Sequence, residues 1–332
     1  MKRANAIVSA ALALTLVAAL AACTPRSGGS SSSSSAPSSS ASSSSSMASS
    51  YAPSAPSVPH SEPGVISGLE DDIKDAASAV ESTVTPTMST DFDKIGALGT
   101  EQVPWGAGVL VDEQNRTTEP QLHQEEYGQY GAYFIAPADC GKFYLTFDEG
   151  YENGFTPQIL DVLKEKGVRA VFFVTGDFVR TQPELVQRMI DEGHVVGNHT
   201  NRHKNPTQVP LEEAAADIRE LHEAVEERFG YTMSLYRPPE GAFSEQTLAM
   251  VQQMGYTTCL WSFAYKDYDV NDQPDVETAY ARTTKFIHEG AIYLLHAVSE
   301  TNAAILGDLI DEVRARGLEL APWDLPYVEP AN

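Results

Sequence analysis

The 332-residue sequence has few basic residues and few cysteines. Lysine and arginine total 22 against 46 aspartate and glutamate residues, which gives a formal net charge of −24 at pH 7. A chain this acidic lacks the cations that neutralise phosphates, so its composition argues against a nucleic-acid partner. A charged surface that keeps the protein soluble is the simplest explanation of the acidity. The apolar run at residues 6–22 is short for a membrane-spanning helix, which needs about 20 residues.

The first residues predict export from the cell. Lys2 and Arg3 precede the apolar run, and small residues lie before a cut site, so residues 1–22 read as a signal peptide. Residues 20–23 (LAAC) resemble the bacterial lipobox, in which the cysteine becomes the lipidated first residue of a mature lipoprotein. We therefore expect a protein anchored to the outer face of the cell membrane through lipidated Cys23. The alternatives are an ordinary signal peptide with an unrelated cysteine, and a retained membrane anchor.

The remaining sequence divides into three parts. Residues 23–58 carry the lipidated cysteine and then mostly Ser, Ala, Pro and Gly, which predicts a disordered tether. Residues 59–140 read as an N-terminal extension that packs on the following domain, with a short amphipathic helix at 69–82. Residues 141–328 form the predicted catalytic domain. Outside the cell a bridge between Cys140 and Cys259 is allowed, and a buried, unpaired Cys259 is the alternative.

Strand-like and helix-like runs alternate from residue 142 onward. The strand candidates share β-branched and aromatic residues and lie at 142–147, 169–174, 194–197, 235–237, 257–263, 291–295 and 318–321. Helix boundaries between them are marked by proline or a capping residue at the start and glycine at the end. The alternation predicts an α/β fold with a parallel sheet, a distorted or incomplete (β/α) barrel of about seven strands. Chemistry in such barrels lies at the carboxyl ends of the strands, where Asp148, His199, Arg237, Trp261 and His296 all fall.

Polar residues at these strand ends suggest a hydrolytic site. His199 and His203 are four residues apart, a spacing that suits one metal ion, although such a pair can also be a solvated surface feature. Asp148 and Glu149 could supply a metal ligand and a base for bound water, with Gly150 permitting the turn. Arg237, ahead of the stiff Pro238–Pro239 pair, needs a carboxylate partner, and Asp148 is the candidate, with a purely structural ion pair as the alternative.

The last strand supplies a candidate acid. His296 directly follows an apolar run, and a general acid is the group that the site still lacks, although a lone histidine there can also be structural. Asp267 could hydrogen-bond it and raise its pKa. Trp261 and Tyr268 offer flat faces that suit sugar rings, and core packing is an equal alternative for Trp261.

Taken together, these motifs resemble the polysaccharide deacetylases, carbohydrate esterase family four. The resemblance covers roughly residues 142–325 and rests on TFDEG at 146–150, HTNRH at 199–203, RPPEG at 237–241 and LLH at 294–296. Within the family the chain is most similar to the peptidoglycan N-acetylmuramic acid deacetylases that form muramic δ-lactam. The segments supporting that branch are YENG at 151–154, which includes Asn153, and WSFA at 261–264, LLHAVS at 294–299 and PWG at 104–106.

The resemblance implies a role for each matching residue. Asp148 would be the base, and Arg237 would hold it in position. His199, His203 and Glu149 would bind a divalent metal ion, with Zn²⁺ as the first candidate and other divalent ions as alternatives. Glu240 would offer its backbone N–H to the oxyanion. His296 would be the acid, paired with Asp267. Leu294 would line the pocket for the acetyl methyl group. The other implied substrate-binding residues are Trp261, Tyr268 and Asn153.

The chain departs from the family pattern at two positions. Glu149 stands where a second aspartate is usual, and Tyr268 stands where many members have tryptophan. We expect hydrolysis of an N-acetyl group on N-acetylmuramic acid in peptidoglycan, with release of acetate. N-acetylglucosamine in peptidoglycan or another surface polysaccharide is the alternative substrate. A non-catalytic wall-binding lipoprotein, with a site disabled at Glu149, is the alternative of another class.

Overall fold

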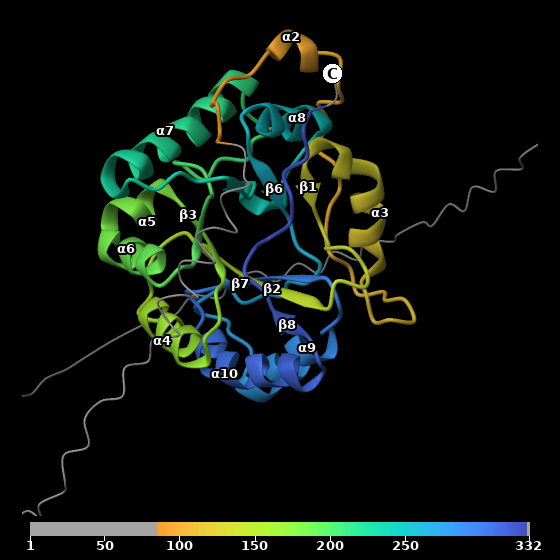
Figure 1. Cartoon of the computed structure of the whole chain (residues 1–332), viewed down its shortest axis with the longest axis vertical. Coiled ribbons are helices and arrows are strands. Elements are labelled where there is room, and N and C mark those ends of the chain that lie inside the picture. The colour runs from red at the N-terminus through yellow and green to blue at the C-terminus, as the bar shows by residue number, and fades with distance from the viewer. Residues whose placement is uncertain (1–84, 331–332) are drawn as a thin grey trace, which may run out of the picture. The chain divides into compact units, whose positions relative to one another are not determined.

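The computed structural model describes residues 85–330 (Figure 1). Their strands form one sheet in the order β1-β6-β5-β4-β3-β2-β7, with β8 paired to β2, and every pairing is parallel. The strands are β1 (Ala132–Tyr133), β2 (Lys142–Glu149), β3 (Val171–Val174), β4 (Val195–Asn198), β5 (Leu235–Tyr236), β6 (Thr257–Cys259), β7 (Ala291–His296) and β8 (Glu319–Leu320). This curled sheet confirms the predicted incomplete α/β barrel.

Helices cover the outside of the sheet. They are α2 (Phe92–Ile95), α3 (Thr118–Tyr127), α4 (Thr156–Lys166), α5 (Gly176–Thr181), α6 (Pro183–Asp191), α7 (Leu211–Phe229), α8 (Glu245–Gln253), α9 (Val276–Lys285) and α10 (Glu300–Ala315), with short 3₁₀ turns at Gly128–Tyr130 and Pro239–Gly241. The sequence marked α4, α6, α7, α8 and α10 by their caps. It missed α2 and α3, α5, which has only six residues, and α9, whose Thr- and Val-containing sequence is a weak helix former.

Strand β2 shows how the sheet divides its side chains. Phe143, Leu145 and Phe147 pack outward with the helices, whereas Tyr144 belongs to the separate cluster inside the barrel. Successive residues of a strand point to opposite faces, so Asp148 continues the inner row. The same rule places Glu149 on the outer face of the sheet, toward the helices.

The barrel is not closed by a strand pair between β6 and β7. The expected strand at 257–263 ends early at Cys259, and the chain then crosses toward β7. Contacts across the gap are the Phe263–Tyr293 bridge and the hydrogen bonds from Ser262 N to Ile292 O and from Leu294 N to Phe263 O. Trp261 is therefore carried on an irregular segment between the two strands.

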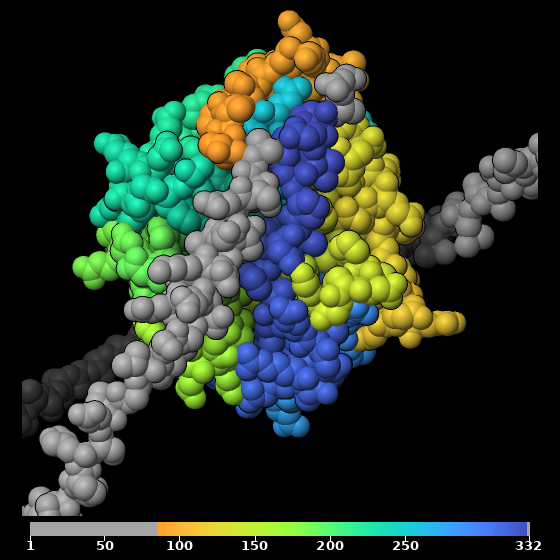
Figure 2. Space-filling view, in the orientation of Figure 1, coloured from red at the N-terminus to blue at the C-terminus, as the bar shows by residue number. Residues whose placement is uncertain are grey.

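The boundary predicted at residue 140 cuts through the sheet. β1 lies before it and pairs with β6, so the end of the predicted extension supplies an edge strand of the barrel. At the opposite end of the chain, residues 321–330 cross the amino ends of the strands, visible as a blue band in Figure 2. Hydrogen bonds from Ala321 N to Phe143 O and from Tyr133 Oη to Pro326 O hold this segment.

Several expectations concern residues outside this range. The signal peptide, lipidated Cys23, the tether and the helix at 69–82 all lie before residue 85. Within residues 85–330, no helix combines the length and the hydrophobicity that crossing a bilayer requires. Cys140 and Cys259 are both free thiols, and Cys259 is buried.

Two buried histidines away from the pocket predict a loss of stability in acid. Burial lowers the pKa values of His194 and His288 to about 4 from an ordinary 6.5. His194 Nδ1 accepts from Ala170 N–H at 3.1 Å, and His288 Nε2 accepts from the Ser262 hydroxyl at 3.0 Å. Each ring can accept this hydrogen bond only while it is neutral, so protonation would break it. Between pH 4 and pH 6.5 these two histidines bind more protons in the unfolded chain than in the folded protein. The free energy of unfolding therefore falls as the pH drops from 6.5 toward 4.

We expect urea unfolding followed by tryptophan fluorescence to show this fall. Glutamine cannot titrate, so His288→Gln should flatten the dependence of the unfolding free energy on pH by about 1 kcal/mol or more across the window. Equal pH dependence in the two proteins would contradict the assignment.

Candidate active site

Arg237 is the centre of the barrel interior. It follows β5 and is completely buried, and the ring of Phe173 lies 4.2 Å from its Cζ. The guanidinium donates to Asp148 Oδ1 at 2.8 Å, to Thr146 Oγ1 at 2.8 Å and to Cys259 O at 2.9 Å. A buried cation needs such a full set of acceptors, because each unmet donor would carry a desolvation cost.

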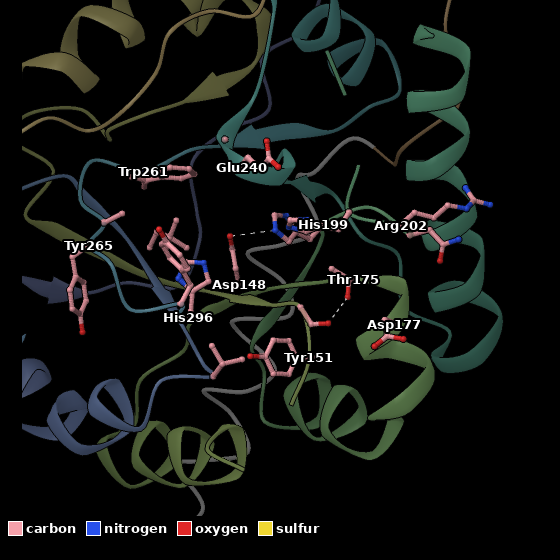
Figure 3. A pocket seen from close by; sticks show the side chains of 18 residues that line it. Asp148, Tyr151, Thr175, Asp177, His199, Arg202, Glu240, Trp261, Tyr265 and His296 are labelled. Atoms are coloured by element: carbon pink, nitrogen blue, oxygen red, sulfur yellow. Dashed lines mark hydrogen bonds and ion pairs between the residues drawn. The ribbon is translucent and has the colours of Figure 1, made fainter. Parts of the chain in front are cut away.

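Asp148 lies between His199 and His296 in the pocket (Figure 3), and Arg237 contacts it from the barrel interior. Arg237 holds Oδ1, and His199 Nε2 lies 3.5 Å from Oδ2. Burial alone would raise the pKa of Asp148, but the positive charge of Arg237, with smaller contributions from the neighbouring His199 and His296, holds that pKa below its ordinary value. The carboxylate is therefore ionised at neutral pH and can accept a proton.

The two predicted ligand histidines lie together in the loop after β4. Their ring centroids are 4.8 Å apart. His199 Nδ1 lies 2.8 Å from the Arg237 carbonyl oxygen, to which it can only donate, so Nε2 carries the free lone pair. Burial lowers the pKa of His199 to about 4, which keeps this ring neutral and able to bind a metal.

Glu149 is not brought to this histidine pair. Its side chain faces α4, where Oε2 accepts from Thr156 Oγ1 at 3.3 Å and Oε1 is buried without a hydrogen-bond partner. Burial, with the charge of Glu152 beside it, raises the pKa of Glu149 well above its ordinary value. The expectation that adjacent carboxylates share one site therefore does not match this geometry, because Asp148 and Glu149 lie on opposite faces of β2.

The donor chemistry of the site fits a metal ion only in part. His199 lies beside both His203 and Asp148, but among residues 85–330 no group of three His, Cys, Asp or Glu side chains is arranged to hold a metal ion. The two histidine nitrogens fit a divalent metal. A third protein ligand is not in place beside them.

His296 and Asp267 form a hydrogen-bonded pair on the other side of Asp148. His296 Nδ1 lies 2.7 Å from Asp267 Oδ1, which leaves Nε2 as the second ring nitrogen, and the ring lines the pocket. Burial opposes protonation, but the charge and hydrogen bond of Asp267 raise the pKa of His296 above its ordinary value. The imidazolium is thus favoured, as a general acid requires.

Glu240 occupies a strained turn at the rim. Its φ of 60° and ψ of 6° are left-handed values, which cost energy for a residue with a Cβ. Pro238 and Pro239 have no N–H, so Glu240 supplies the first backbone donor after Arg237. Its side chain accepts from Asn205 Nδ2 at 3.1 Å, and Asn205 also donates to Gln102 Oε1 at 3.2 Å.

The N-terminal extension braces this rim. Val103 N donates to Phe243 O at 2.9 Å, and the ring of Trp105 lies 5.8 Å from that of Trp261 in an edge-to-face arrangement. Trp105 also lies against Gly241, where a Cβ would meet its ring at 3.0 Å. The extension therefore contacts both the RPPEG turn and the predicted sugar platform.

A cavity of about 740 Å³ is lined by Asp148, His199, His203, Glu240 and His296. Leu294, Trp261 and Tyr268 lie in its wall as predicted, and the Tyr268 ring stands 5.7 Å from His296. Asn153 does not line it, because its amide donates to Val298 O at 2.9 Å. The sequence interpretation missed other lining residues, which follow no single motif: Tyr151, Thr175, Asp177, Asn201, Arg202 and Tyr265. Thr146, beside Asp148 in the first motif, was also missed as a partner of Arg237.

Comparison with known proteins agrees with this geometry. Residues 136–259 match the family described as polysaccharide deacetylase. Peptidoglycan-N-acetylmuramic acid deacetylase PdaA of Bacillus subtilis is 40% identical over 222 residues, which cover 67% of this chain and 84% of PdaA. Peptidoglycan-N-acetylglucosamine deacetylase PgdA of Listeria monocytogenes is 34% identical over 186 residues, which cover 56% of this chain and 38% of PgdA.

The fold comparison gives the same result. The structure of Bacillus subtilis PdaA, a family 4 carbohydrate esterase, superposes with a TM-score of 0.63 at 38% identity and covers 66% of this chain and 94% of that one. The fold and site thus define a hydrolase that acts on amide bonds. The chain belongs to the polysaccharide deacetylase family, so the resemblance expected from the motifs is confirmed. Deacetylases of this family are generally metal-dependent.

The loop that carries both histidines depends on a glycine at the start of α5. A Cβ on Gly176 would lie 1.8 Å from Asn201 Oδ1 and 2.7 Å from the Asn201 carbonyl oxygen. Gly176→Ala must therefore displace the 199–203 loop. We expect at least about tenfold weaker Zn²⁺ binding by calorimetry, in the range found when groups supporting metal ligands are removed.

Gly307→Ala is the matched control for this substitution. Gly307 lies in α10, and its Cβ would meet only ordinary contacts at 3.7 and 3.8 Å. Alanine is the better helix former there, so metal binding should be unchanged and the melting temperature unchanged or higher. Wild-type Zn²⁺ affinity in Gly176→Ala would show that the loop does not need this close approach.

Proposed function

We propose that this protein is a divalent-metal-dependent deacetylase of N-acetylmuramic acid in peptidoglycan, whose product closes to muramic δ-lactam. The observation that carries the proposal is the position of Asp148. It lies between Arg237 and His199, with the His296–Asp267 pair on its other side. This arrangement supplies a fixed base and a separate acid around one cavity.

His199 and His203 would hold the metal ion, with Zn²⁺ as the first candidate. When bound, the ion supplies Lewis-acid polarisation of the acetyl carbonyl and lowers the pKa of a water molecule. The neutral state of His199 and the direction of its Nε2 support this role. The contribution of Glu149 as a third ligand would require its side chain to leave Thr156.

Asp148 acts as the base. It takes a proton from water as the water oxygen attacks the acetyl carbonyl carbon, and Arg237 keeps its carboxylate aimed at that oxygen. The backbone N–H of Glu240 donates to the developing oxyanion, at a turn whose strained conformation fixes its direction. Leu294 gives the acetyl methyl group an apolar wall.

His296 acts as the acid. It protonates the sugar nitrogen as the C–N bond breaks, so acetate and a free amine are formed. On a muramic acid without a peptide, that amine can attack the lactyl carboxyl group, forming the lactam and releasing water. Similarity to PdaA supports muramic acid as the sugar.

The proposed location is the cell wall side of the membrane. A signal peptide at 1–22, a lipid on Cys23 and a tether at 23–58 would attach the enzyme to the membrane's outer face and let the domain reach peptidoglycan. Metabolic labelling with a radioactive fatty acid, compared between wild type and Cys23→Ala, tests this attachment. Equal incorporation of label into the two proteins would rule out lipidation of Cys23.

Mass spectrometry of peptide-stripped glycan strands tests the activity. The domain with Zn²⁺ should remove acetyl groups from muramic acid and then a water molecule, and Asp148→Asn, which keeps the shape but not the base, should slow this by about 100-fold or more. Loss of acetyl from glucosamine alone would instead assign the alternative sugar. No mass change by a metal-loaded protein would favour a non-catalytic wall-binding protein.

Metal titration tests the ligand set independently of activity. Because Glu149 faces Thr156, Glu149→Gln should bind Zn²⁺ within about threefold of wild type, whereas His203→Gln should bind at least about 100-fold more weakly. A large loss of affinity in Glu149→Gln would mean that its carboxylate turns inward to ligate the ion.

A further inference from the structure

The pairing of His296 with Asp267 depends on a third side chain. Asp267 is fully buried, and its Oδ2 accepts from His296 N at 2.9 Å and from Asn302 Nδ2 at 2.6 Å. Asn302 Nδ2 also donates to the His296 carbonyl oxygen at 3.1 Å. The Asn302 amide thus holds both the Asp267 carboxylate and the backbone of His296, the histidine that Asp267 supports.

The hydrogen bonds fix the orientation of the Asn302 amide. Both of its N–H groups meet acceptors, and its Oδ1 accepts from the Tyr265 hydroxyl. The reversed amide would place its oxygen against a carboxylate and a carbonyl, which repel it. Asn302 is completely buried, so water cannot replace any of these partners.

The fold explains why this amide is in reach. Asn302 lies in the first turn of α10, and its own N–H is capped by Ser299 Oγ at 3.0 Å. α10 begins just after β7, so its first turn returns beside the end of the strand that carries His296. The amino end of a helix also favours the negative charge of Asp267.

We propose that Asn302 is a positioning residue for the catalytic acid: it holds the Asp267 carboxylate aligned on Nδ1 of His296, so that Nε2 is the nitrogen that delivers the proton. This inference rests on the proposed function, in which His296 is the acid. Tyr265, which lines the cavity, locks the amide from its other end. The chain Tyr265–Asn302–Asp267–His296 therefore links one cavity wall to the acid.

The residue type matters because of its charge. Asn302 is neutral and can donate at every pH, so the hydrogen bond that Asp267 receives from it does not depend on pH. An aspartate at 302 could donate to Asp267 only while protonated. The titratable groups around this position are Asp267, His296 and Tyr265, with Asp148 and Arg237 acting on His296, and Arg282 of α9 on Tyr265.

Two substitutions and a control test the role. Asn302→Leu keeps the branched shape and the number of side-chain heavy atoms but removes all three hydrogen bonds, and we expect kcat to fall about 10- to 100-fold while KM stays within about twofold. Asn302→Asp should approach wild-type kcat at low pH and lose it as the pH rises. Thr301→Val, in the same turn, removes only a bond to Pro274 O at 2.9 Å and should leave kcat and its pH profile unchanged.

Nitrogen NMR of labelled histidine gives a readout that does not need turnover. In wild type, His296 should carry its neutral-state proton on Nδ1, and Asn302→Leu should lose this fixed tautomer while Thr301→Val keeps it. If the wild type acts on no glycan but these spectra change as expected, the proposed function fails and the positioning role stands. An active wild type with unchanged kcat and spectrum in Asn302→Leu, or an Asn302→Asp profile parallel to wild type, would overturn the inference.

Discussion

The buried ion pair between Arg237 and Asp148 is the interaction on which the site depends. The guanidinium is fully enclosed and its donors are distributed over β2, β6 and the segment that follows β6. Removing one member of such a pair leaves an uncompensated charge in the core, at a cost of about 3–5 kcal/mol. The pair thus ties the ends of several strands together, and the same contact keeps the Asp148 carboxylate ionised.

The alternation of side chains along β2 decides how the acidic pair is used. Asp148 and Glu149 are neighbours in the sequence, but one faces Arg237 and the other faces Thr156 of α4. One carboxylate has its pKa lowered and the other raised, because only the inner one meets cations. Two chemically similar groups therefore have different protonation states within one dipeptide.

The proposed acid and the proposed base are held by separate parts of the barrel. Asp148 depends on strands β2 and β5, whereas His296 depends on β7, the segment after β6 and the first turn of α10. The RPPEG turn between them is braced from outside by the extension through Val103 and Trp105. This division explains why one reaction centre needs contributions from almost the whole described chain.

The sequence by itself determined the fold class and most strand positions, because hydrophobic periodicity is a local signal. Its motifs also pointed to Asp148, Arg237, His199, His203 and His296 as the candidate site. It could not determine which face of β2 carries Glu149, since that follows from register against the neighbouring strands. Nor could it find β1, a two-residue strand defined only by its pairing with β6. Asn302 follows Asp267 by thirty-five positions, and only the packing of α10 against the barrel brings the two together.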